Sequence, residues 1–513
     1  GLRARLSAAN LEFLTGRFHR AAEQTQAIAA EATAEAYDEI AGDALELGSA
    51  AYGELSDPRR FESLAQAYYL AAPTDGERAA RRAVGLARQH AYAQHVTEAR
   101  RWLRHAEAAG QRAPGKMHTA AMTHVRGLLP PGDRNGLTSL ELFRRARVEL
   151  GELSSTEHEL SWLVNADLMG SLLAANRLDD ARVLGQTLRG ETVAQWGPSH
   201  PRLAGLQMNL AKIAGRRGDA EGAIEMSKQA VALSEEVYGS VNLRTAAAYL
   251  ALGGMYHRFE KPEDARRSLR RGLRAHGSTP TQYLALLQRG LGELHAEADE
   301  PELAEPFFRE TIRIGEQVWP RDLPQLAVMR REWAESLLET GAFEQAAAEL
   351  SRLRDSPAGT QTRTRFELAR IASRTGRLDE AIEGYRRAWL DCEDKDETWC
   401  LLSGARLAST YVHEGRLGEA REQLERMAGG ESSAGAAIAL AQAELAWAEG
   451  DKSRARALTA GVVVAGRHYA SRLQRRDLQA WRQRHPPLSN ASKRPQKINR
   501  QAATSGAYAR PPQ

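Results

Sequence analysis

The sequence predicts an all-α solenoid of about twelve helical hairpins. Three observations support this fold class. The 513-residue chain is rich in Ala, Leu, Arg and Glu, which favour helices, and only 6% of its residues are aromatic. Residues 203–239 read as two short helices around a turn at Gly218-Asp219, because apolar or small side chains recur at helical spacing on both sides. The same template fits the following stretches of the chain, so we expect an array.

A small residue early in the second helix of each hairpin gives a register mark along the chain. Successive marks are about 35 or about 42 residues apart. Ten of the twelve are alanine, because close contact between two helices requires a small side chain. The marks are Ala21, Leu64, Ala99, Leu140, Ala181, Ala223, Ala265, Ala304, Ala346, Ala381, Ala420 and Ala455.

Glycine marks the predicted turns inside the hairpins. In six of them a glycine lies five residues before the mark, where a tight turn favours a positive φ. These are Gly16, Gly218, Gly341, Gly376, Gly415 and Gly450. The longer units also carry Gly or Pro between one hairpin and the next, at residues 196–201, 238–240 and 276–280. We expect helices to end and begin there.

The two ends of the array differ from its middle. A helix is predicted almost from Leu2, with no polar capping repeat before it, so we expect a further segment upstream of Gly1. Residues 110–140 match the template poorly because Pro130-Pro131-Gly132 interrupts it. A last amphipathic helix is predicted over 462–484. The expected domains are a solenoid over 1–470, the end of a capping helix over 471–484, and a basic disordered tail over 485–513.

The repeated pattern resembles the tetratricopeptide repeat. The resemblance rests on a Leu with an adjacent small residue on the first helix, as in Leu252-Gly253, a bulky residue three positions on, as in Tyr256, and the alanine mark. The longer units, from Gly197 to Gly239, are similar to the repeats of kinesin light chains. The mixture of unit lengths resembles arrays that follow the kinase domain in bacterial serine/threonine kinases. The resemblance spans 1 to about 470 and implies a right-handed superhelix that binds protein partners.

Charge is distributed unevenly along the chain. The net charge is +4, but residues 452–513 carry fourteen basic residues against the single acid Asp477, or +13, which leaves −9 on residues 1–451. The sequence thus predicts an acidic rod with a basic tail. This tail could contact nucleic acid weakly, although Tyr508 is the one aromatic residue for base stacking in its disordered part, residues 485–513.

Cysteine usage and hydropathy bear on location. The two cysteines, Cys392 and Cys400, are too few for a disulfide framework, so we expect reduced thiols and a cytoplasmic protein. The apolar run over 457–466 is much shorter than the roughly 20 residues that span a bilayer, and no signal peptide opens the chain. We therefore expect no membrane span.

No catalytic constellation is found in the sequence. The segment from Gly110 to Met117 fits a phosphate-binding loop except at its last position, where Met117 replaces a hydroxyl residue, and a helix is predicted before it. Residues 475–478 lack the remaining parts of a kinase catalytic loop. No histidine pair has metal-ligand spacing. We therefore predict a non-enzymatic chain with no cofactor, metal or catalytic residue.

The candidate site is the concave face of the array, formed by the first helix of each hairpin. Counting back from the marks places one set of side chains there, and its Arg and Lys members could hydrogen-bond the carboxylates and carbonyls of an extended segment. Asn209 matches, by resemblance, the Asn with which light-chain-like repeats hold a peptide backbone. The predicted groove residues are Met208, Asn209, Lys212, Leu250, His257, Arg289, Glu293, Arg331, Glu335, Phe366 and Arg370.

Three functions remain open from the sequence. The first is a non-catalytic scaffold that binds a protein or peptide in its groove. The second is the regulatory region of a larger serine/threonine kinase whose catalytic domain is absent from this chain. The third is a nucleic-acid-associated adaptor that uses the basic tail. The partner, the signal sensed and the oligomeric state are not specified by the sequence.

Overall fold

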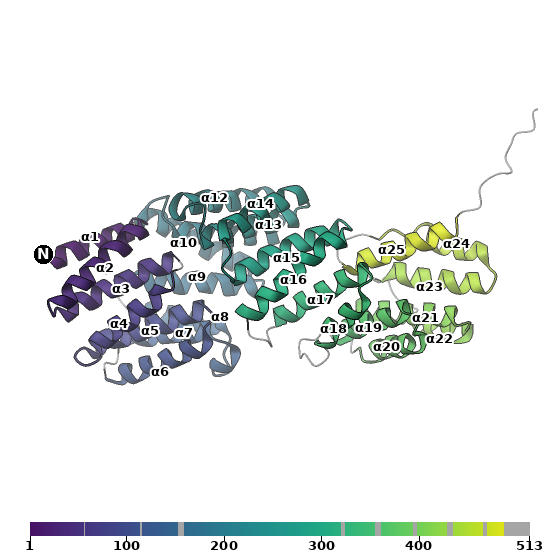
Figure 1. Cartoon of the computed structure of the whole chain (residues 1–513), viewed down its shortest axis with the longest axis horizontal. Coiled ribbons are helices and arrows are strands. Elements are labelled where there is room, and N and C mark those ends of the chain that lie inside the picture. Colours follow the sequence, from purple (N-terminus) through teal and green to yellow (C-terminus); the bar gives the residue numbers. More distant parts are fainter. Residues whose placement is uncertain are drawn as a thin grey trace, which may run out of the picture. The chain divides into compact units, whose positions relative to one another are not determined.

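The structure is a computed structural model that describes residues 1–55, 57–112, 115–151, 158–319, 324–353, 361–392, 398–427, 434–464 and 469–486. These residues form twenty-five α-helices and one short 3-10 helix, with no strand among them. The all-α solenoid predicted from the sequence is confirmed. The chain divides into two compact units, Gly1–Thr340 and Gly341–Gln513, each described here by itself (Figure 1).

The first unit contains seventeen of the described helices. They are α1 (Leu2–Leu14), α2 (Phe18–Ala34), α3 (Asp38–Glu54), α4 (Arg59–Ala71), α5 (Gly76–Tyr92), α6 (Val96–Arg112), α7 (Lys116–Leu128), the 3-10 helix η1 (Pro131–Asp133), α8 (Ser139–Gly151), α9 (His158–Ala174), α10 (Leu178–Trp196), α11 (Arg202–Arg216), α12 (Ala220–Tyr238), α13 (Leu243–Arg258), α14 (Pro262–His276), α15 (Gln282–Glu297), α16 (Pro301–Val318) and α17 (Pro324–Glu339).

The second unit continues the same alternation. Its described helices are α18 (Phe343–Ser351), α19 (Gln361–Arg374), α20 (Leu378–Leu390), α21 (Thr398–His413), α22 (Leu417–Arg426), α23 (Gly435–Ala448), α24 (Lys452–Ala460) and α25 (Tyr469–Arg484). The sequence predicts a single array over 1–470. This stays a prediction, because the structure divides the chain into two units between residues 340 and 341. The predicted tail lies almost entirely outside the described residues, beyond Pro486.

Every register mark lies early in an even-numbered helix. We call the odd-numbered helices from α1 to α23 the A helices and the even-numbered helices from α2 to α24 the B helices. Eleven marks are buried, and Leu140 is partly buried against its neighbours. The small residue on helix A has a matching role: a Cβ on Gly253 would lie 2.7 Å from Leu269 of the B helix. Small residues on both helices therefore let the pair pack closely.

The turns inside the hairpins share one backbone geometry. The residue five before the mark has a positive φ, between +53° and +92°, in eleven of the twelve hairpins. The six predicted glycine turns are confirmed, and the other five positions hold Gln94, Asn135, Asn176, Glu260 and Asp299. The backbone amide of the residue after the positive-φ position closes the turn with a hydrogen bond. Asp219 N, for example, donates to the carbonyl oxygen of Ala214 at 3.0 Å.

The poorly matching stretch over 110–140 still forms a hairpin in its described part. Helix α7 ends at Leu128, η1 occupies Pro131–Asp133, and Asn135 supplies the positive φ before α8. The prolines lengthen the turn but do not abolish the repeat, since proline fits the first turn of a short helix.

Helix α25 covers the apolar side of the last hairpin. Trp481 lies in a buried cluster with Leu440, Ala443 and Ala455 of α23 and α24, and Leu473 belongs to the core of the second unit. Helix α25 begins at Tyr469, whereas the sequence predicted a helix from residue 462. The described residues 462–464 therefore precede the helix.

A group of long-range contacts joins the start and the middle of the first unit. Arg244 donates from Nε to the carbonyl of Glu54 at 2.8 Å and pairs with the Glu54 carboxylate at 3.0 Å. The Tyr238 hydroxyl donates to the same carboxylate at 3.3 Å, and its ring stacks on Phe18 with centroids 6.0 Å apart. We call these four residues the clasp. It connects the first two hairpins with the sixth and seventh (Figure 1).

The two cysteines are paired. Cys392, which follows α20, and Cys400, in the first turn of α21, are joined by a disulfide with their Cα atoms 6.2 Å apart. The prediction of two reduced thiols is therefore wrong. Counting cysteines missed the pair because the end of one B helix and the start of the next A helix come together, which brings two residues eight positions apart into bonding range.

Candidate functional site

The candidate site lies on the A helices of hairpins six to nine. Helix α13 packs against both α11 and α15, so the outward side chains of successive A helices lie side by side. We call the surface formed by the outward side chains of α11, α13, α15 and α17 the A-helix face. Helices α11, α13 and α15 are each covered on their other sides by their own B helix and by the preceding hairpin.

The first predicted groove residues line α11 and α13. Met208 and Leu250 are half-buried and pack on the hydrophobic core between these helices, and Asn209 is half-buried as well. Lys212 is exposed, yet the protein around it excludes enough water, with the nearby Arg216 charge, to lower its pKa.

The next predicted residues form a hydrogen-bonded network. Arg289 of α15 donates to both carboxylate oxygens of Glu332 on α17, at 2.9 and 2.8 Å, and pairs with Glu293 at 2.7 Å. His257 of α13 lies 2.8 Å from Glu297 of α15. The structure therefore brings His257 of α13 close to Arg289 and Glu293 of α15, and Glu332 links them to α17.

Two carboxylates of this network, Glu297 and Glu332, were not predicted as site residues. Both were detectable in the sequence: Glu297 lies one helical turn after Glu293, and Glu332 occupies the position that Asn209 holds in the sixth hairpin. Burial, with the neighbouring carboxylates, raises the pKa of Glu293 to about 7 even though the Arg289 charge opposes this shift. The carboxylates of Glu293, Glu297 and Glu332 thus carry more negative charge than Arg289 neutralises.

Four predicted groove residues are buried instead. Phe366 is fully buried in the core of the second unit, where its ring lies 5.7 Å from that of Tyr385, so its placement on a binding surface is corrected. Arg331 and Glu335 are both buried on α17, 4.0 Å apart. Arg370 is buried on α19 and pairs with Glu367 at 3.0 Å. The register count gave the correct helices but not how deeply these side chains are covered.

Another polar cluster lies on the A helices of hairpins three to five. The Asp167 carboxylate of α9 accepts from the Tyr92 hydroxyl of α5 at 2.6 Å and lies 2.7 Å from Nε2 of His124 on α7. Burial lowers the pKa of His124, and the protein that displaces water around the Tyr92 hydroxyl, together with the Asp167 charge, raises the pKa of the partly exposed Tyr92. A shared carboxylate anchors three hairpins here, and no nucleophile completes a catalytic arrangement among these residues.

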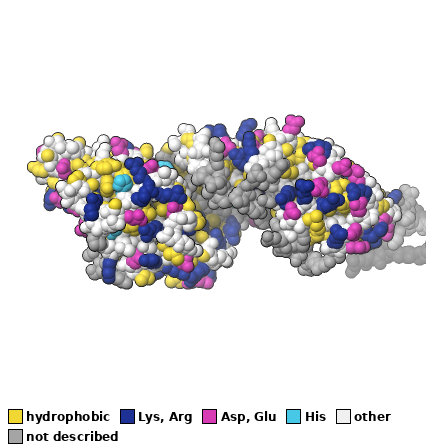
Figure 2. All heavy atoms as spheres, turned by 90° about the horizontal axis from the view of Figure 1, so that it is seen from below, with side chains coloured by type: hydrophobic (Ala, Val, Ile, Leu, Met, Phe, Trp, Pro, Cys, Tyr) yellow, Lys and Arg dark blue, Asp and Glu magenta, His cyan; other side chains and the backbone are white. Residues whose placement is uncertain are grey.

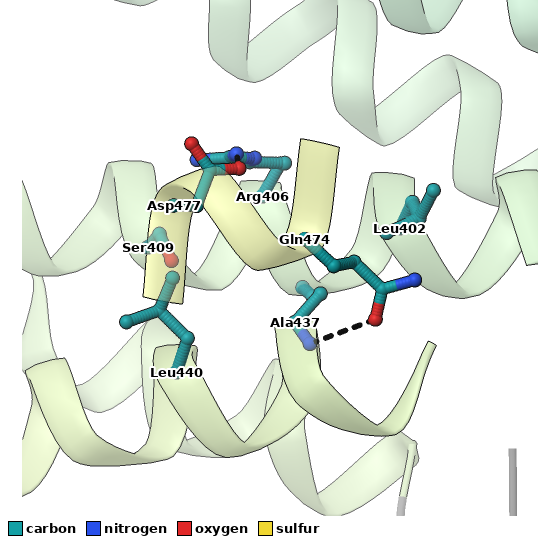
Figure 3. Close-up of a pocket in the computed structure, with 8 residues that line it drawn as sticks. Leu402, Arg406, Ser409, Ala437, Leu440, Gln474 and Asp477 are labelled. Atoms are coloured by element: carbon teal, nitrogen blue, oxygen red, sulfur yellow. Dashed lines mark hydrogen bonds and ion pairs between the residues drawn. The ribbon is translucent and has the colours of Figure 1, made fainter. Parts of the chain in front are cut away.

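The second unit contains a small pocket between α21, α23 and α25. Figure 3 shows Arg406 and Asp477 pointing toward each other as an ion pair, while Gln474 accepts from the backbone amide of Ala437 at 3.3 Å. The cavity volume is about 10 Å³. This is the lower limit for a single water molecule, so the pocket is too small for a metabolite.

The two segments that partly match known catalytic or phosphate-binding motifs, residues 110–117 and 475–478, have structural roles. Helix α6 ends at Arg112, inside the segment resembling a phosphate loop, and α7 begins at Lys116, so helices flank it on both sides. Asp477 of the 475–478 segment forms the ion pair of the pocket. In the described ranges no group of three His, Cys, Asp or Glu residues could hold a metal ion. Among the helices that the structure describes, none is long and apolar enough to cross a bilayer.

The surface of the molecule carries charges of both signs. Figure 2 shows Lys and Arg side chains intermixed with Asp and Glu on the face displayed. Most of the exposed pairs lie within a helix or between neighbouring hairpins, such as Arg217 with Asp179. Such pairs keep a solenoid in solution more than they stabilise it.

Comparison with known proteins gives one family match. The model described as "Tetratricopeptide repeat" matches residues 202–276, which run from the first residue of α11 to the last of α14. Among the curated proteins none matches.

Solved structures resemble the fold at low identity. A chain of the APC/C hetero-tetramer Cut9-Hcn1 is 13% identical, with 93% of this chain and 90% of that chain covered and a TM-score of 0.46. A tetratricopeptide repeat protein from Parabacteroides merdae is 15% identical over 54% of this chain and 98% of its own, with a TM-score of 0.43. A Podosopora anserina protein described as a kinesin light chain with nearly identical TPR-like repeats is 18% identical over 49% of this chain and 98% of its own, with a TM-score of 0.26. The sequence match to the tetratricopeptide repeat family thus covers the sixth and seventh hairpins, and the same two-helix unit recurs on both sides of them.

Proposed function

We propose that this chain is a non-catalytic interaction scaffold that binds an extended segment of a partner protein along the A-helix face. The observation that carries the proposal is the set of polar side chains presented by successive A helices: Lys212 on α11, His257 on α13, and Arg289 with Glu293 on α15. These helices include the hairpins that match the tetratricopeptide repeat family.

The chemistry of this face suits a polypeptide. Lys212 can donate to the carbonyls or carboxylates of a bound segment, while Glu293 and Glu297 can accept from its amides or its basic side chains. The half-buried Met208 and Leu250 add apolar contact between these polar positions. A mixed surface of this kind supports recognition of a peptide better than turnover of a small substrate, and the pocket between α21, α23 and α25 is too small to hold one.

Three finer points stay predictions. The regulatory region of a serine/threonine kinase is suggested by the resemblance of the repeat lengths, and the sequence encoded upstream of Gly1 tests it. The cytoplasmic location is tested by fractionation of cells that express the chain, since the disulfide between Cys392 and Cys400 does not support it. A nucleic-acid adaptor would use residues 485–513, and deleting them tests it: weak DNA binding at low salt should disappear while binding to a protein partner persists.

Two lysines of one hairpin provide a matched test of the A-helix face. Lys212 lies on α11, and Lys228 is exposed on the B helix α12 of the same hairpin. Peptides selected from a random library on the immobilised chain should lose about tenfold in affinity with Lys212→Glu, because a favourable contact becomes a repulsion. Lys228→Glu should leave the affinity unchanged. Selected peptides that bind both variants equally well, or a library that yields no binder, would contradict the proposal.

A further inference from the structure

Helix α14 carries a row of arginines on its outer side. Arg267, Arg270, Arg271 and Arg274 are all exposed, and their spacing places them on one helix face, opposite the buried Ala265, Leu269 and Gly272. We call these four residues the arginine stripe. It is about 10 Å long, because the helix rises 1.5 Å per residue. The stripe belongs to a B helix and is separate from the A-helix face (Figure 1).

The stripe is only partly neutralised by this chain. Arg267 lies 3.5 Å from Asp264, and Arg271 lies near the Tyr249 hydroxyl. For Arg270 and Arg274 the described part of the chain provides no ion pair or hydrogen bond. Arginines three and four residues apart repel one another and destabilise a helix slightly. The C-terminal end of α14 favours one cation in its last turn, which accounts for Arg274 but not for Arg270.

The charge surrounding the stripe limits what it can bind. Helix α14 carries a net charge of +3, while the B helices of the neighbouring hairpins, α12 and α16, carry −3 and −2. The cationic surface is therefore one helix wide, about 10 Å. A nucleic acid that crossed several hairpins would meet acidic helices on both sides, and none of the exposed residues of α14 is aromatic for base stacking.

We propose that the arginine stripe of α14 is a docking surface for an extended acidic segment of a partner protein that runs along the helix. Arg270 and Arg274 are four residues apart and thus about 6 Å apart along the axis. Carboxylates at alternate positions of an extended segment recur about every 6.6 Å, since each residue adds about 3.3 Å. The two guanidinium groups can therefore each bind a carboxylate of the same segment through paired hydrogen bonds.

The probe for this proposal is a short fluorescent peptide of alternating Glu and Ser, titrated with the full chain. Arg270→Gln combined with Arg274→Gln should weaken binding about tenfold, because each exposed pair contributes up to about 1 kcal/mol. A matched control lies on α16, where Arg313 and Arg309 are already paired with Glu310 at 2.7 Å and Glu305 at 3.8 Å. Arg309→Gln combined with Arg313→Gln removes the same charge and should change binding less than about twofold.

Two further measurements separate docking from a structural role or from nucleic-acid binding. The α14 variant should melt at the same or a higher temperature, because it removes repulsion between like charges. An oligothymidylate of similar length should bind more weakly than the peptide at about 150 mM salt, where screening weakens contacts with a long polyanion. Equal loss of peptide binding in the α14 and α16 variants would overturn the proposal. So would a lower melting temperature of the α14 variant, tighter binding of the oligonucleotide, or no binding of the peptide by the unmodified chain.

Discussion

Arg81 and Arg82 are adjacent on α5 and share a carboxylate, but their surroundings differ. Arg82 is 2% exposed and donates to the carbonyl of Ala67 at 2.8 Å, to Asp43 at 2.8 Å and to Glu46 at 2.9 Å. Arg81 is about half exposed and reaches the same Glu46 at 3.1 Å. The buried guanidinium thus connects three helices, whereas its neighbour pairs at the surface.

We therefore expect unequal effects from the two alanine substitutions. Arg82→Ala should lower the free energy of unfolding by about 3 kcal/mol, because it empties a buried site, removes the Arg82 partner of Asp43 and leaves Glu46 with Arg81 alone. Arg81→Ala should cost less than about 1 kcal/mol. Urea unfolding followed by circular dichroism measures both, and similar shifts in the midpoint would contradict the assignment of Arg82 as the buried connection.

Glu293 gives the A-helix face a measurable pH dependence. Its pKa is raised to about 7 from the usual 4.5 by burial, helped by Glu332 and Glu297 and opposed by Arg289 and His257. Because the folded state holds this proton more tightly than the unfolded state, the contribution of Glu293 to stability falls as pH rises from about 4.5 to 7.

Glu293→Gln should remove this dependence, because the amide does not titrate. The variant should be more stable than the unmodified chain above pH 7, by on the order of 1–3 kcal/mol, and the difference should shrink toward pH 4.5. Thermal unfolding of both proteins at pH 5 and pH 8 measures the change. A constant difference across this range would show that Glu293 is already ionised near its usual pKa.

The candidate site could be predicted only in part, and the reason is visible in single residues. Counting back from an alanine mark fixes the face of an A helix, and on that face Lys212 is exposed while Arg289 is partly buried. The count does not report how far a neighbouring hairpin covers that face, so Phe366 and Arg331 were misjudged as surface residues. Pairs such as Arg289 with Glu332 depend on side chains 43 positions apart, which the spacing of repeats hints at without specifying.

Elements were predicted better than sites, because each hairpin carries its own local signals. The alanine mark, the positive-φ residue and the Gly or Pro between units each act within a few residues, so the prediction did not depend on the rest of the fold. The 110–140 hairpin shows the limit of this reasoning. Its prolines obscured the pattern, although the alternation of helices continued through them.

The turn position offers a paired test at this scale. Gln94 has a φ of +62°, where a side chain is strained, and it is exposed. Gln94→Gly should raise the free energy of unfolding by about 0.5–1 kcal/mol, because glycine adopts this conformation without that strain. At the equivalent Gly218, with a φ of +84°, the change to alanine should cost about 1 kcal/mol, although a Cβ there would meet no atom within 4 Å. Thermal unfolding should therefore shift in opposite directions for the two variants.

At the scale of the first unit, the clasp adds a contact that a simple array lacks. A solenoid is stabilised mainly between neighbouring repeats. Here Arg244 and Tyr238 reach Glu54 and Phe18, so the first two hairpins also depend on the sixth and seventh. Sequence reasoning missed this contact because it follows from small rotations summed over several hairpins, and no local pattern specifies that sum.

A double-mutant cycle tests the clasp in solution. Glu54→Ala and Arg244→Ala should each destabilise the first unit, and together they should cost less than the sum of their effects, with a coupling of about 1 kcal/mol. Arg217 and Asp179, an exposed pair between neighbouring hairpins, provide the control and should couple by no more than about 0.5 kcal/mol. A coupling near zero between Glu54 and Arg244 would mean that the clasp does not form.

The clasp also has a consequence for the order in which the chain becomes complete on the ribosome. Glu54 and Arg244 are 190 positions apart, and synthesis proceeds at about 5–20 residues per second. The first two hairpins are therefore made about 10–40 s before their distant partners emerge. During this interval Phe18 lacks the ring of Tyr238, and a nascent-chain complex stopped before residue 238 should expose it to a protease that the finished protein resists.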